Sequence, residues 1–137
     1  MDIDDKNILG RYDFRISLEQ TDAVGIIHNS VVFRIMEIAE LEGLRELGIH
    51  WLEFDDCFFP RIKVSAEFLR ALRFDDICSV LVKVKRVRAA KVILAHEFYK
   101  ENELMIRGEV EFTCVDRENF QPRMLPEKMM DKLKELV

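Results

Sequence analysis

The chain has 137 residues, of which 49% are hydrophobic and 34% are charged, and its formal net charge is −5. This length predicts a single domain over residues 1–137 that buries roughly two-thirds of the surface of its unfolded chain. The composition is typical of a globular protein rather than a disordered one. The acidic balance gives no support for nucleic-acid binding, because such binding depends on positive charge that displaces counterions from phosphates.

Membrane, export and metal-binding classes are also disfavoured. No apolar run approaches the roughly 20 residues that a membrane-spanning helix requires. Residues 1–6 are acidic and lack the basic flank and apolar core of an export signal. Cys57, Cys78 and Cys114 are odd in number and widely spaced, which argues against a disulfide framework or a zinc site. The sequence therefore predicts a cytoplasmic protein with no membrane span and no bound metal.

The first half of the chain predicts one strand and one long helix. Residues 11–18 alternate between apolar and polar side chains, which is typical of a half-buried strand. Residues 30–47 have apolar side chains at helical spacing, with Asn29 or Ser30 as the N-cap and Gly48 as the stop. Apolar side chains also occupy the opposite side of this helix, so we expect other structure to wrap around it. The first apolar side comprises Val32, Ile35, Met36, Ala39, Gly43 and Leu47. The opposite side carries Val31, Ile38 and Leu41.

The second half predicts a strand-rich region. The expected strands are 61–69, 76–87, 91–100 and 103–115. Residues 88–90 and 101–103 are short enough to be hairpin connections. Pro126 predicts the start of a short C-terminal helix that reaches Leu136. This order of elements predicts an α+β fold in which a curved five-stranded antiparallel sheet wraps around one long central helix.

The loop at residues 19–29 is the candidate site, because it carries Asp22 and Gly25 and leads into the helix. A helix N-terminus presents free amides that can stabilise an oxyanion, while a nearby carboxylate attacks a carbonyl or directs a water. Two other interpretations of Asp22 stay open here. It can form an Asx-turn or a helix cap. It can also bind a metal together with His28, although other ligands at suitable spacing are missing.

Three stretches, in this order, resemble the 4-hydroxybenzoyl-CoA thioesterase family, whose members are hotdog-fold acyl-CoA thioesterases. The first is Thr-Asp-Ala-Val-Gly-Ile-Ile at residues 21–27, followed by a polar pair and a helix that contains a Glu. The second is Phe-Leu-Arg-Ala-Leu-Arg-Phe-Asp-Asp at 68–76. The third is Phe-Thr-Cys-Val-Asp at 112–116, followed by Pro-Arg-Met-Leu-Pro at 122–126. Together these stretches extend the resemblance over nearly the whole chain.

The resemblance implies hydrolysis of an acyl-CoA thioester to a free acid and CoA, without a cofactor, because CoA is part of the substrate. In such a reaction Asp22 attacks the thioester carbonyl or acts as general base to a water. A carboxylate near its reference pKa of about 4 is ionised at pH 7. Gly25 lets the backbone approach the substrate or adopt a conformation closed to other residues. The backbone amides near His28, Asn29 and Ser30 polarise the carbonyl.

The sequence departs from the family pattern directly after the two isoleucines. Family members often have Tyr-His-x-Asn-Tyr there, whereas this chain has His-Asn-Ser-Val-Val at residues 28–32. Asn29 therefore falls where the family has His, two polar groups leave the usual pocket wall, and a more apolar substrate is expected. His28 is either part of the catalytic loop or a simple polar loop residue. Glu37 is the second candidate carboxylate, because another branch of hotdog thioesterases uses a helical Glu at a similar distance; alternatively it forms a surface or interface ion pair.

Basic side chains gather at one strand end and its hairpin. They are Lys83, Lys85, Arg86, Arg88 and Lys91. In a protein with excess acid such a patch invites an anionic ligand, and the matching hairpin of the family binds the nucleotide end of CoA. Arg86, Arg88 and Lys91 are accordingly the predicted phosphate contacts. The alternative is a solvated strand end that Lys protects against edge-to-edge aggregation.

His96 and the three cysteines are not expected to take part in catalysis or to bind a ligand. His96 shares a strand face with apolar neighbours, so it is predicted to be a packing residue rather than a ligand. A Cys nucleophile is disfavoured because no activating base accompanies any of the three cysteines.

The amount of apolar surface predicts self-association. Four aromatic residues follow the helix, namely Trp51, Phe54, Phe58 and Phe59. With the second apolar side of the helix they exceed what one small sheet can cover. The resemblance implies dimers, often paired into tetramers, with the active site at the subunit interface.

Thioester hydrolysis has two alternatives. A non-catalytic acyl- or CoA-binding protein is disfavoured by the presence of both Asp22 and Gly25. A hotdog dehydratase is disfavoured because the chain has no Pro between residues 1 and 59, where such enzymes have a Pro-rich, His-containing entry to the helix.

Overall fold

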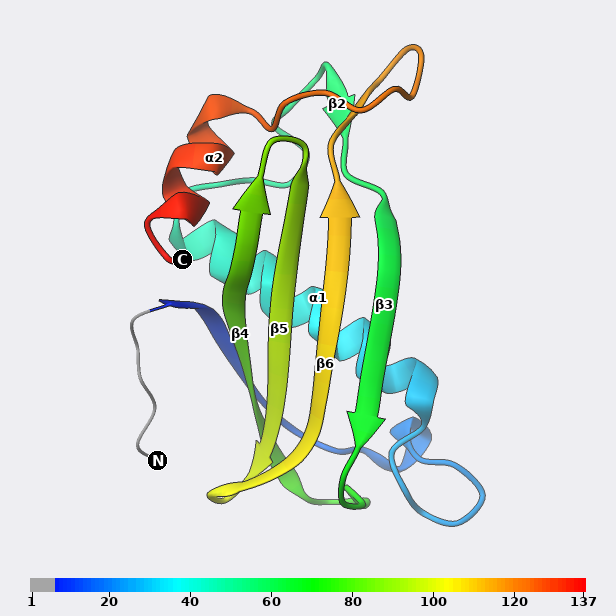
Figure 1. Cartoon of the computed structure of the whole chain (residues 1–137). Coiled ribbons are helices and arrows are strands. Elements are labelled where there is room, and N and C mark those ends of the chain that lie inside the picture. The colour runs from blue at the N-terminus through cyan, green and yellow to red at the C-terminus, as the bar shows by residue number, and fades with distance from the viewer. Residues whose placement is uncertain (1–6) are drawn as a thin grey trace.

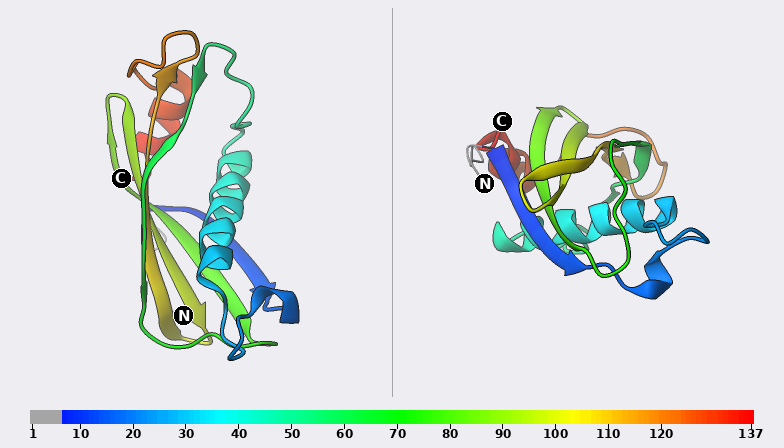
Figure 2. Two further views of the ribbon diagram at one scale, coloured as in Figure 1. Left: turned by 90° about the vertical axis from the view of Figure 1, so that its right-hand side faces the viewer. Right: turned by 90° about the horizontal axis from the view of Figure 1, so that it is seen from below.

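A curved antiparallel sheet wraps around a single long helix, as Figures 1 and 2 show. The computed structural model describes residues 7–137, so the residues on which the prediction of no export signal rests lie outside the described part. The five strands follow the order β1-β4-β5-β6-β3. They are β1 (Ile8–Arg15), β3 (Arg61–Phe68), β4 (Ile77–Arg88), β5 (Lys91–Lys100) and β6 (Glu103–Thr113). This architecture confirms the predicted α+β hotdog fold.

The central helix α1 (Asn29–Glu46) lies in the concave face of the sheet and packs mainly against β1 and β4. Two glycines allow the close approach to β1. A Cβ added to Gly43 would lie 2.7 Å from the carbonyl oxygen of Leu9, and a Cβ added to Gly10 would lie 2.7 Å from the Cα of Gly43. Helix and strand therefore meet backbone to backbone, at a separation that only glycine permits.

The helix ends differ slightly from the prediction. The N-cap is His28 rather than Asn29 or Ser30, and its Nδ1 accepts a hydrogen bond from the Ser30 amide at 3.1 Å. The predicted stop at Gly48 is confirmed by its φ of +79°, a left-handed conformation that favours glycine. Leu47 is the C-cap.

Both predicted hairpins are confirmed, although neither contains an Asn-Gly turn. Two residues, Ala89 and Ala90, connect β4 to β5, and two more connect β5 to β6. Each turn has its first residue in the left-handed region, with φ of +52° at Ala89 and +56° at Glu101. The turns thus adopt the positive φ that two-residue hairpins require without a glycine to supply it.

The predicted first strand is wrong at its C-terminal end. β1 ends at Arg15, and the chain then enters a short 3-10 turn, η2 (Leu18–Gln20), in which Leu18 is exposed. The Gln20 side chain bends back to accept a hydrogen bond from the Ser17 amide at 2.9 Å. This local capping competes with strand extension, which the apolar alternation alone could not reveal.

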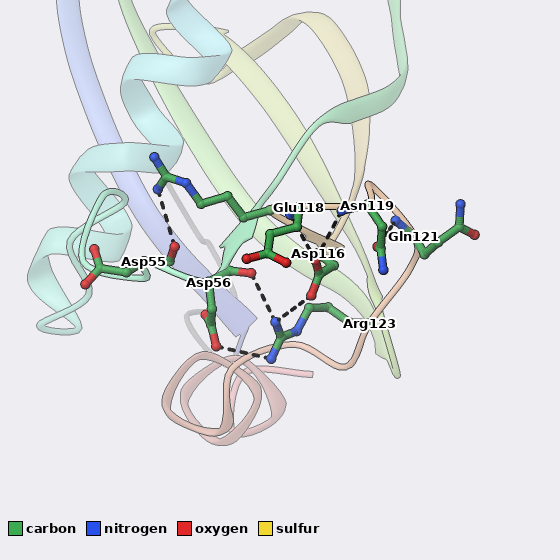
Figure 3. A network of polar contacts seen from close by, with 8 residues as sticks. Asp55, Asp56, Asp116, Glu118, Asn119, Gln121 and Arg123 are labelled. Carbon is green, nitrogen blue, oxygen red and sulfur yellow. Dashed lines mark hydrogen bonds and ion pairs between the residues drawn. The ribbon is translucent and has the colours of Figure 1, made fainter.

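A second, two-stranded sheet was not predicted. It pairs β2 (Cys57–Phe58) with β7 (Val115–Asp116). Figure 3 shows the side chains of Asp56, Asp116 and Arg123 pointing toward one another beside it. Arg123 donates to the Asp116 carboxylate at 3.2 Å and to the Asp56 carboxylate at 3.1 Å. These charge-assisted contacts tie the C-terminal segment to the chain that follows α1.

The C-terminal helix α2 (Glu127–Lys134) begins directly after Pro126, as predicted, and ends slightly before Leu136. Met129, Met130 and Leu133 bury its apolar face in the core. Neither helix within residues 7–137 is long and apolar enough to cross a membrane.

The aromatic group after α1 is better covered than the sequence suggested. The Trp51 ring lies 4.8 Å from that of Phe59 and 5.6 Å from that of Phe112, centroid to centroid, and Phe59 is buried. Phe58 alone of the four predicted aromatic residues is among the exposed apolar side chains. On the helix, Phe33 and Ile38 stay exposed, so only part of its second apolar side is uncovered.

Candidate active site

The loop before α1 is fixed against the turn that leads into β4. The Ile27 amide donates to the carbonyl of Leu72 at 2.8 Å, and the Asp75 amide donates to the carbonyl of Ile16 at 2.8 Å. Ile27 and Leu72 are buried, so they anchor the loop in the core. The exposed part of the loop, residues 22–24, therefore projects from a firm base at one end of the sheet.

Asp22 is exposed, and one of its carboxylate oxygens is bonded within its own loop. Oδ1 accepts hydrogen bonds from the amides of Val24 at 2.9 Å and Ile26 at 3.1 Å. These two bonds, that of Val24 first, lower the pKa of Asp22 below its ordinary value of 3.8. The group is therefore a carboxylate at neutral pH. No protein group in residues 7–137 donates a hydrogen bond to Oδ2, which leaves that oxygen free to act on a substrate.

The backbone conformation at position 25 explains why the loop has a glycine there. Its φ is +80°, and an added Cβ would meet no heavy atom within 4 Å. Two reasons for this glycine were predicted, close approach of the backbone to the substrate and a conformation closed to other residues. The protomer shows the second. The turn lets both Val24 and Ile26 direct their amides at Oδ1 of Asp22.

The first turn of α1 offers one open backbone donor. The His28 amide donates to the carbonyl of Gln20 at 2.8 Å. The Ser30 amide is shared between Nδ1 of His28 at 3.1 Å and the side-chain oxygen of Asn29 at 2.9 Å. The Asn29 amide has no acceptor within the described chain. Of the three amides that the sequence suggested, that of Asn29 is therefore the one available to polarise a carbonyl.

Two of the residues at which this sequence departs from the family pattern lie in the protein interior. Val31 and Val32 are both buried in the core. Apolar side chains therefore stand where the family pattern has Asn and Tyr, and the expectation of a more apolar substrate stays a prediction.

Glu37 lies elsewhere on the helix and is exposed. It follows Asn29 by about two turns, or roughly 12 Å along the helix axis, so one protomer does not bring it to Asp22. Within residues 7–137 it forms no ion pair on the surface of the protomer, and an ion pair at a subunit interface stays a prediction. It lines a groove of about 150 Å³ between α1 and β3.

The three predicted phosphate contacts share one cavity. Its volume is about 380 Å³, and it is lined by Arg86, Arg88, Ala89, Ala90, Lys91, Ile93 and Glu111. Two other basic residues of the same patch are neutralised: Lys83 pairs with Glu97 at 3.0 Å and Lys85 pairs with Glu109 at 2.8 Å. The hairpin therefore presents the remaining positive charge to a ligand.

Asp22 and the basic hairpin lie at opposite ends of the sheet, as Figure 1 shows for the loop before α1 and the β4–β5 turn. The loop of Asp22 packs beside the start of β4, whereas Arg88 is the last residue of that strand. A strand of this length spans about 35 Å. The two predicted halves of the site do not meet within one protomer.

Sequence reasoning missed a buried charged cluster. Glu40 on α1 is 2% exposed, and its carboxylate lies 2.7 Å from Nε2 of His96 and 2.6 Å from Nη1 of Arg61. His96 is fully buried, as expected of a packing residue, and the neighbour that sequence reasoning missed is the Glu40 carboxylate. The available signal was a charged residue inside an apolar helix stripe together with a His on the inward face of a strand.

Metal binding finds no support in the arrangement of side chains. Across residues 7–137, no group of three or more His, Cys, Asp or Glu residues is placed to hold an ion. The metal interpretation of Asp22 and His28 therefore lacks the further ligands that it needs.

Known proteins share the fold of this chain and include relatives in sequence. A 1,4-dihydroxy-2-naphthoyl-CoA thioesterase from Synechocystis superposes with a TM-score of 0.86 at 16% identity, over 93% of this chain and 96% of that chain. A gentisyl-coenzyme A thioesterase superposes with a TM-score of 0.81 at 23% identity, over 90% and 98% of the two chains. The acyl-CoA thioester hydrolase YbgC of Escherichia coli is 26% identical over 130 residues, which cover 93% of this chain and 97% of that protein.

The family model of the thioesterase-like superfamily matches residues 16–133. This span includes the loop of Asp22, the central helix, the basic hairpin and the start of the last helix. The chain therefore belongs to the thioesterase-like superfamily.

Proposed function

We propose that this protein hydrolyses acyl-CoA thioesters to a free acid and CoA. The observation that carries the proposal is the ionised carboxylate of Asp22, held with one free oxygen in the loop that leads into α1. The superfamily match and the similarity to acyl-CoA thioester hydrolase YbgC support the same reaction. The basic cavity at the β4–β5 hairpin supplies a place for the phosphates of CoA.

The proposed chemistry needs few groups. Oδ2 of Asp22 either attacks the thioester carbonyl or takes a proton from the water that attacks it. The Asn29 amide donates to the carbonyl oxygen and stabilises the negative charge that forms there. The carbon–sulfur bond then breaks, and CoA leaves as a thiolate. When a water attacks, the free acid forms directly; when Asp22 attacks, a water then hydrolyses the mixed anhydride between the acyl group and Asp22, which releases the acid and restores the carboxylate. A thiolate is a good leaving group near neutral pH, so a strong general acid is not required.

The opposite placement of Asp22 and the basic hairpin supports a site shared between two copies. The span of about 35 Å along β4 exceeds the pantetheine arm that separates the thioester from the phosphates of CoA. β3 is an edge strand with exposed apolar side chains, namely Ile62, Val64 and Phe68. Two copies that pair antiparallel through β3 bring the Asp22 end of one next to the hairpin end of the other.

In this arrangement Arg86, Arg88 and Lys91 of one copy bind the phosphates of a CoA whose thioester lies at Asp22 of the other. The exposed Phe33 and Ile38 on α1 add apolar surface for such a dimer. Pairing of two such dimers gives the tetramer that the family resemblance implies. Cys57, Cys78 and Cys114 are free and buried, which fits action in the reducing cytoplasm.

The test is turnover by the purified protein across acyl-CoAs of different chain length and aromaticity, with a thiol reagent to detect released CoA. The Asp22→Asn variant should lose about 1000-fold or more in kcat while its Tm stays unchanged, because the amide keeps the loop contacts but loses the reactive charge. Asp131→Asn, a matched change at an exposed position of α2, is the control.

Retention of most activity by Asp22→Asn would transfer the catalytic role to Glu37. Binding of acyl-CoA without release of CoA by the wild type would replace hydrolysis with a non-catalytic binding function.

A further inference from the structure

The loop of Asp22 and the turn before β4 meet in one pair of residues. Ile26 and Arg73 lie opposite each other in an isolated antiparallel bridge. Backbone hydrogen bonds between the residues that flank this pair hold it together, and the pair itself exchanges none. They are the bond from the Ile27 amide to the Leu72 carbonyl at 2.8 Å and the bond from the Phe74 amide to the Gly25 carbonyl at 3.4 Å. In such a pair the amide and the carbonyl of each central residue point away from the partner, so both residues need other partners for these groups.

Two aspartates supply these partners, one on each side of the bridge. On one side, the Asp22 amide donates to the Ile26 carbonyl at 2.8 Å, and the Ile26 amide donates to Oδ1 of Asp22 at 3.1 Å. On the other side, the Asp76 amide donates to the Arg73 carbonyl at 3.1 Å, and the Arg73 amide donates to Oδ2 of Asp76 at 2.8 Å. Asp76 therefore binds Arg73 in the same way as Asp22 binds Ile26.

The Asp76 carboxylate is built into the turn, unlike that of its neighbour Asp75. The Asp76 side chain is only 16% exposed, and its Oδ1 lies 3.0 Å from Nζ of Lys100. The Asp75 side chain is 63% exposed and pairs with Arg15 on the surface at 3.2 Å. A largely buried charge is retained where it is both paired and hydrogen-bonded. The Asp76 carboxylate is thus held from two directions, by the amide of Arg73 and by the ammonium group of Lys100.

The turn needs these contacts because its backbone is strained. Asp75 has a φ of +73°, a left-handed conformation that residues other than glycine rarely adopt. Such a conformation persists only where the surrounding contacts fix it. Without the Asp76 carboxylate the Arg73 amide loses its acceptor, and the turn can relax. A shift of Arg73 then moves Ile26, which lies opposite it and supplies one of the two amides that orient Asp22.

We propose that Asp76 is a positioning residue for catalysis, and that its carboxylate fixes the direction of Asp22 through Arg73 and Ile26. The proposal rests on the proposed thioesterase function and adds a residue to its machinery. Asp76 acts on the bridge and makes no contact with the reacting atoms. Its removal should withdraw the Ile26 amide from Oδ1 of Asp22, so that Oδ2 is no longer held toward the thioester. A displacement of about 1 Å at a reacting group can lower a rate by about 100-fold.

The first experiment separates kcat from KM in variants of the turn. Asp76→Ala should lower kcat by about 10-fold or more and change KM by at most about twofold, because the basic hairpin lies at the other end of the sheet. Asp76→Asn keeps an oxygen that can accept from the Arg73 amide, so it should recover most of the lost kcat. Asp75→Asn is the matched control, because Asn tolerates the left-handed conformation and only the exposed ion pair is lost. It should have the kcat of the wild type.

The second experiment follows the ionisation of Asp22 without turnover. Carboxyl-carbon NMR gives its pKa, and the Asp22→Asn variant identifies its signal. The hydrogen bonds from Val24 and Ile26 lower this pKa in the wild type. Loss of the Ile26 bond disfavours the carboxylate, so the pKa of Asp22 should be higher in Asp76→Ala than in the wild type and unchanged in Asp75→Asn. The signal comes from folded molecules, so a partly unfolded preparation still gives a reading.

A kcat of Asp76→Ala equal to that of the wild type would overturn the positioning role. Equal losses of kcat in Asp76→Ala and Asp76→Asn would also overturn it, because the bond to the Arg73 amide would then not be responsible. An Asp22 pKa that Asp76→Ala leaves unchanged would do the same.

The NMR measurement also separates this proposal from the proposed function. If no acyl-CoA is hydrolysed by the wild type, a raised Asp22 pKa in Asp76→Ala would retain the link from Asp76 to Asp22 and reject hydrolysis alone. Hydrolysis by the wild type with an unchanged Asp22 pKa in Asp76→Ala would retain the thioesterase function and reject the link.

Discussion

Asp22 uses one carboxylate oxygen to shape its own loop and keeps the other free. The structural interpretation, an Asx-type turn, and the catalytic interpretation therefore describe two atoms of the same side chain. Oδ1 satisfies the amides of Val24 and Ile26, and this fixes the direction of Oδ2. Such self-orientation reduces the rotamer freedom that a reactive carboxylate would otherwise lose on binding substrate.

The lowered pKa of Asp22 makes a prediction for the pH profile. Because the two amide hydrogen bonds favour the carboxylate, the group stays ionised as the pH falls and protonates only below its ordinary value of 3.8. We expect kcat/KM to show no acid limb from Asp22 between about pH 5 and pH 7. Measurement of kcat/KM across this range tests the assignment, and a limb centred near pH 6 that disappears in Asp22→Asn would contradict it.

The positive φ of Gly25 leads to a second prediction, for the replacement of this residue. Gly25→Ala should lower the free energy of unfolding by about 1–2 kcal/mol, because an L-residue is strained at its positive φ although space for the side chain exists. Activity should fall as well, since relief of the strain moves the amides that orient Asp22. Gly25→Asn is the control, because Asn tolerates this conformation. Urea unfolding and kcat measure both effects, and equal losses in the two variants would refute the conformational explanation.

Among the elements, the contact of α1 with β1 is the most sensitive to side-chain size. Gly43→Ala should destabilise the protein by about 1–3 kcal/mol, because the new Cβ would lie 2.7 Å from the carbonyl oxygen of Leu9 and force the helix outward. Glu42→Ala, at the adjacent exposed position, should change stability by at most about 0.5 kcal/mol. Thermal unfolding of both variants tests this contact, and a neutral Gly43→Ala would show that the helix is free to shift.

The elements could be predicted because their signals are local and repeated. The alternation along β6 and the apolar spacing along α1 each extend over many residues, so single exceptions did not obscure them. The end of β1 and the N-cap of α1 were missed because single hydrogen bonds decide them, and the acceptors are the side chains of Gln20 and His28. The two-residue pairing of β2 with β7 is too short to leave a periodic signal.

The difference between local and non-local signals also explains which parts of the site could be predicted. Asp22, Gly25 and the basic hairpin lie in short contiguous stretches, so a linear motif reveals them. The cluster of Glu40, Arg61 and His96 unites a helix and two strands that are distant in sequence. Its existence follows from the packing of α1 against the sheet, which no local pattern encodes.

For the whole molecule, the separation of Asp22 from the basic hairpin predicts complementation between two inactive variants. Asp22→Asn lacks the reactive carboxylate, and the double variant Arg88→Ala with Lys91→Ala should have a raised KM because it lacks phosphate contacts. A mixed dimer has one site with both defects and one site with neither. After co-refolding of equal amounts, about a quarter of the wild-type activity should return at low substrate concentration.

The control is a mixture of the same variants that is combined without refolding, which should stay inactive while the subunits do not exchange. Activity that never exceeds the sum of the separate variants would show that each chain builds its site alone.

The exposed edge of β3 has a consequence for how the enzyme responds to dilution. If neither chain holds a complete set of reacting groups, catalysis requires that two chains stay together, and the rate per chain declines once the concentration falls below the dissociation constant of the pair. The helix and sheet of each chain can remain intact throughout this loss. The abundance of the protein then sets its specific activity as well as its amount.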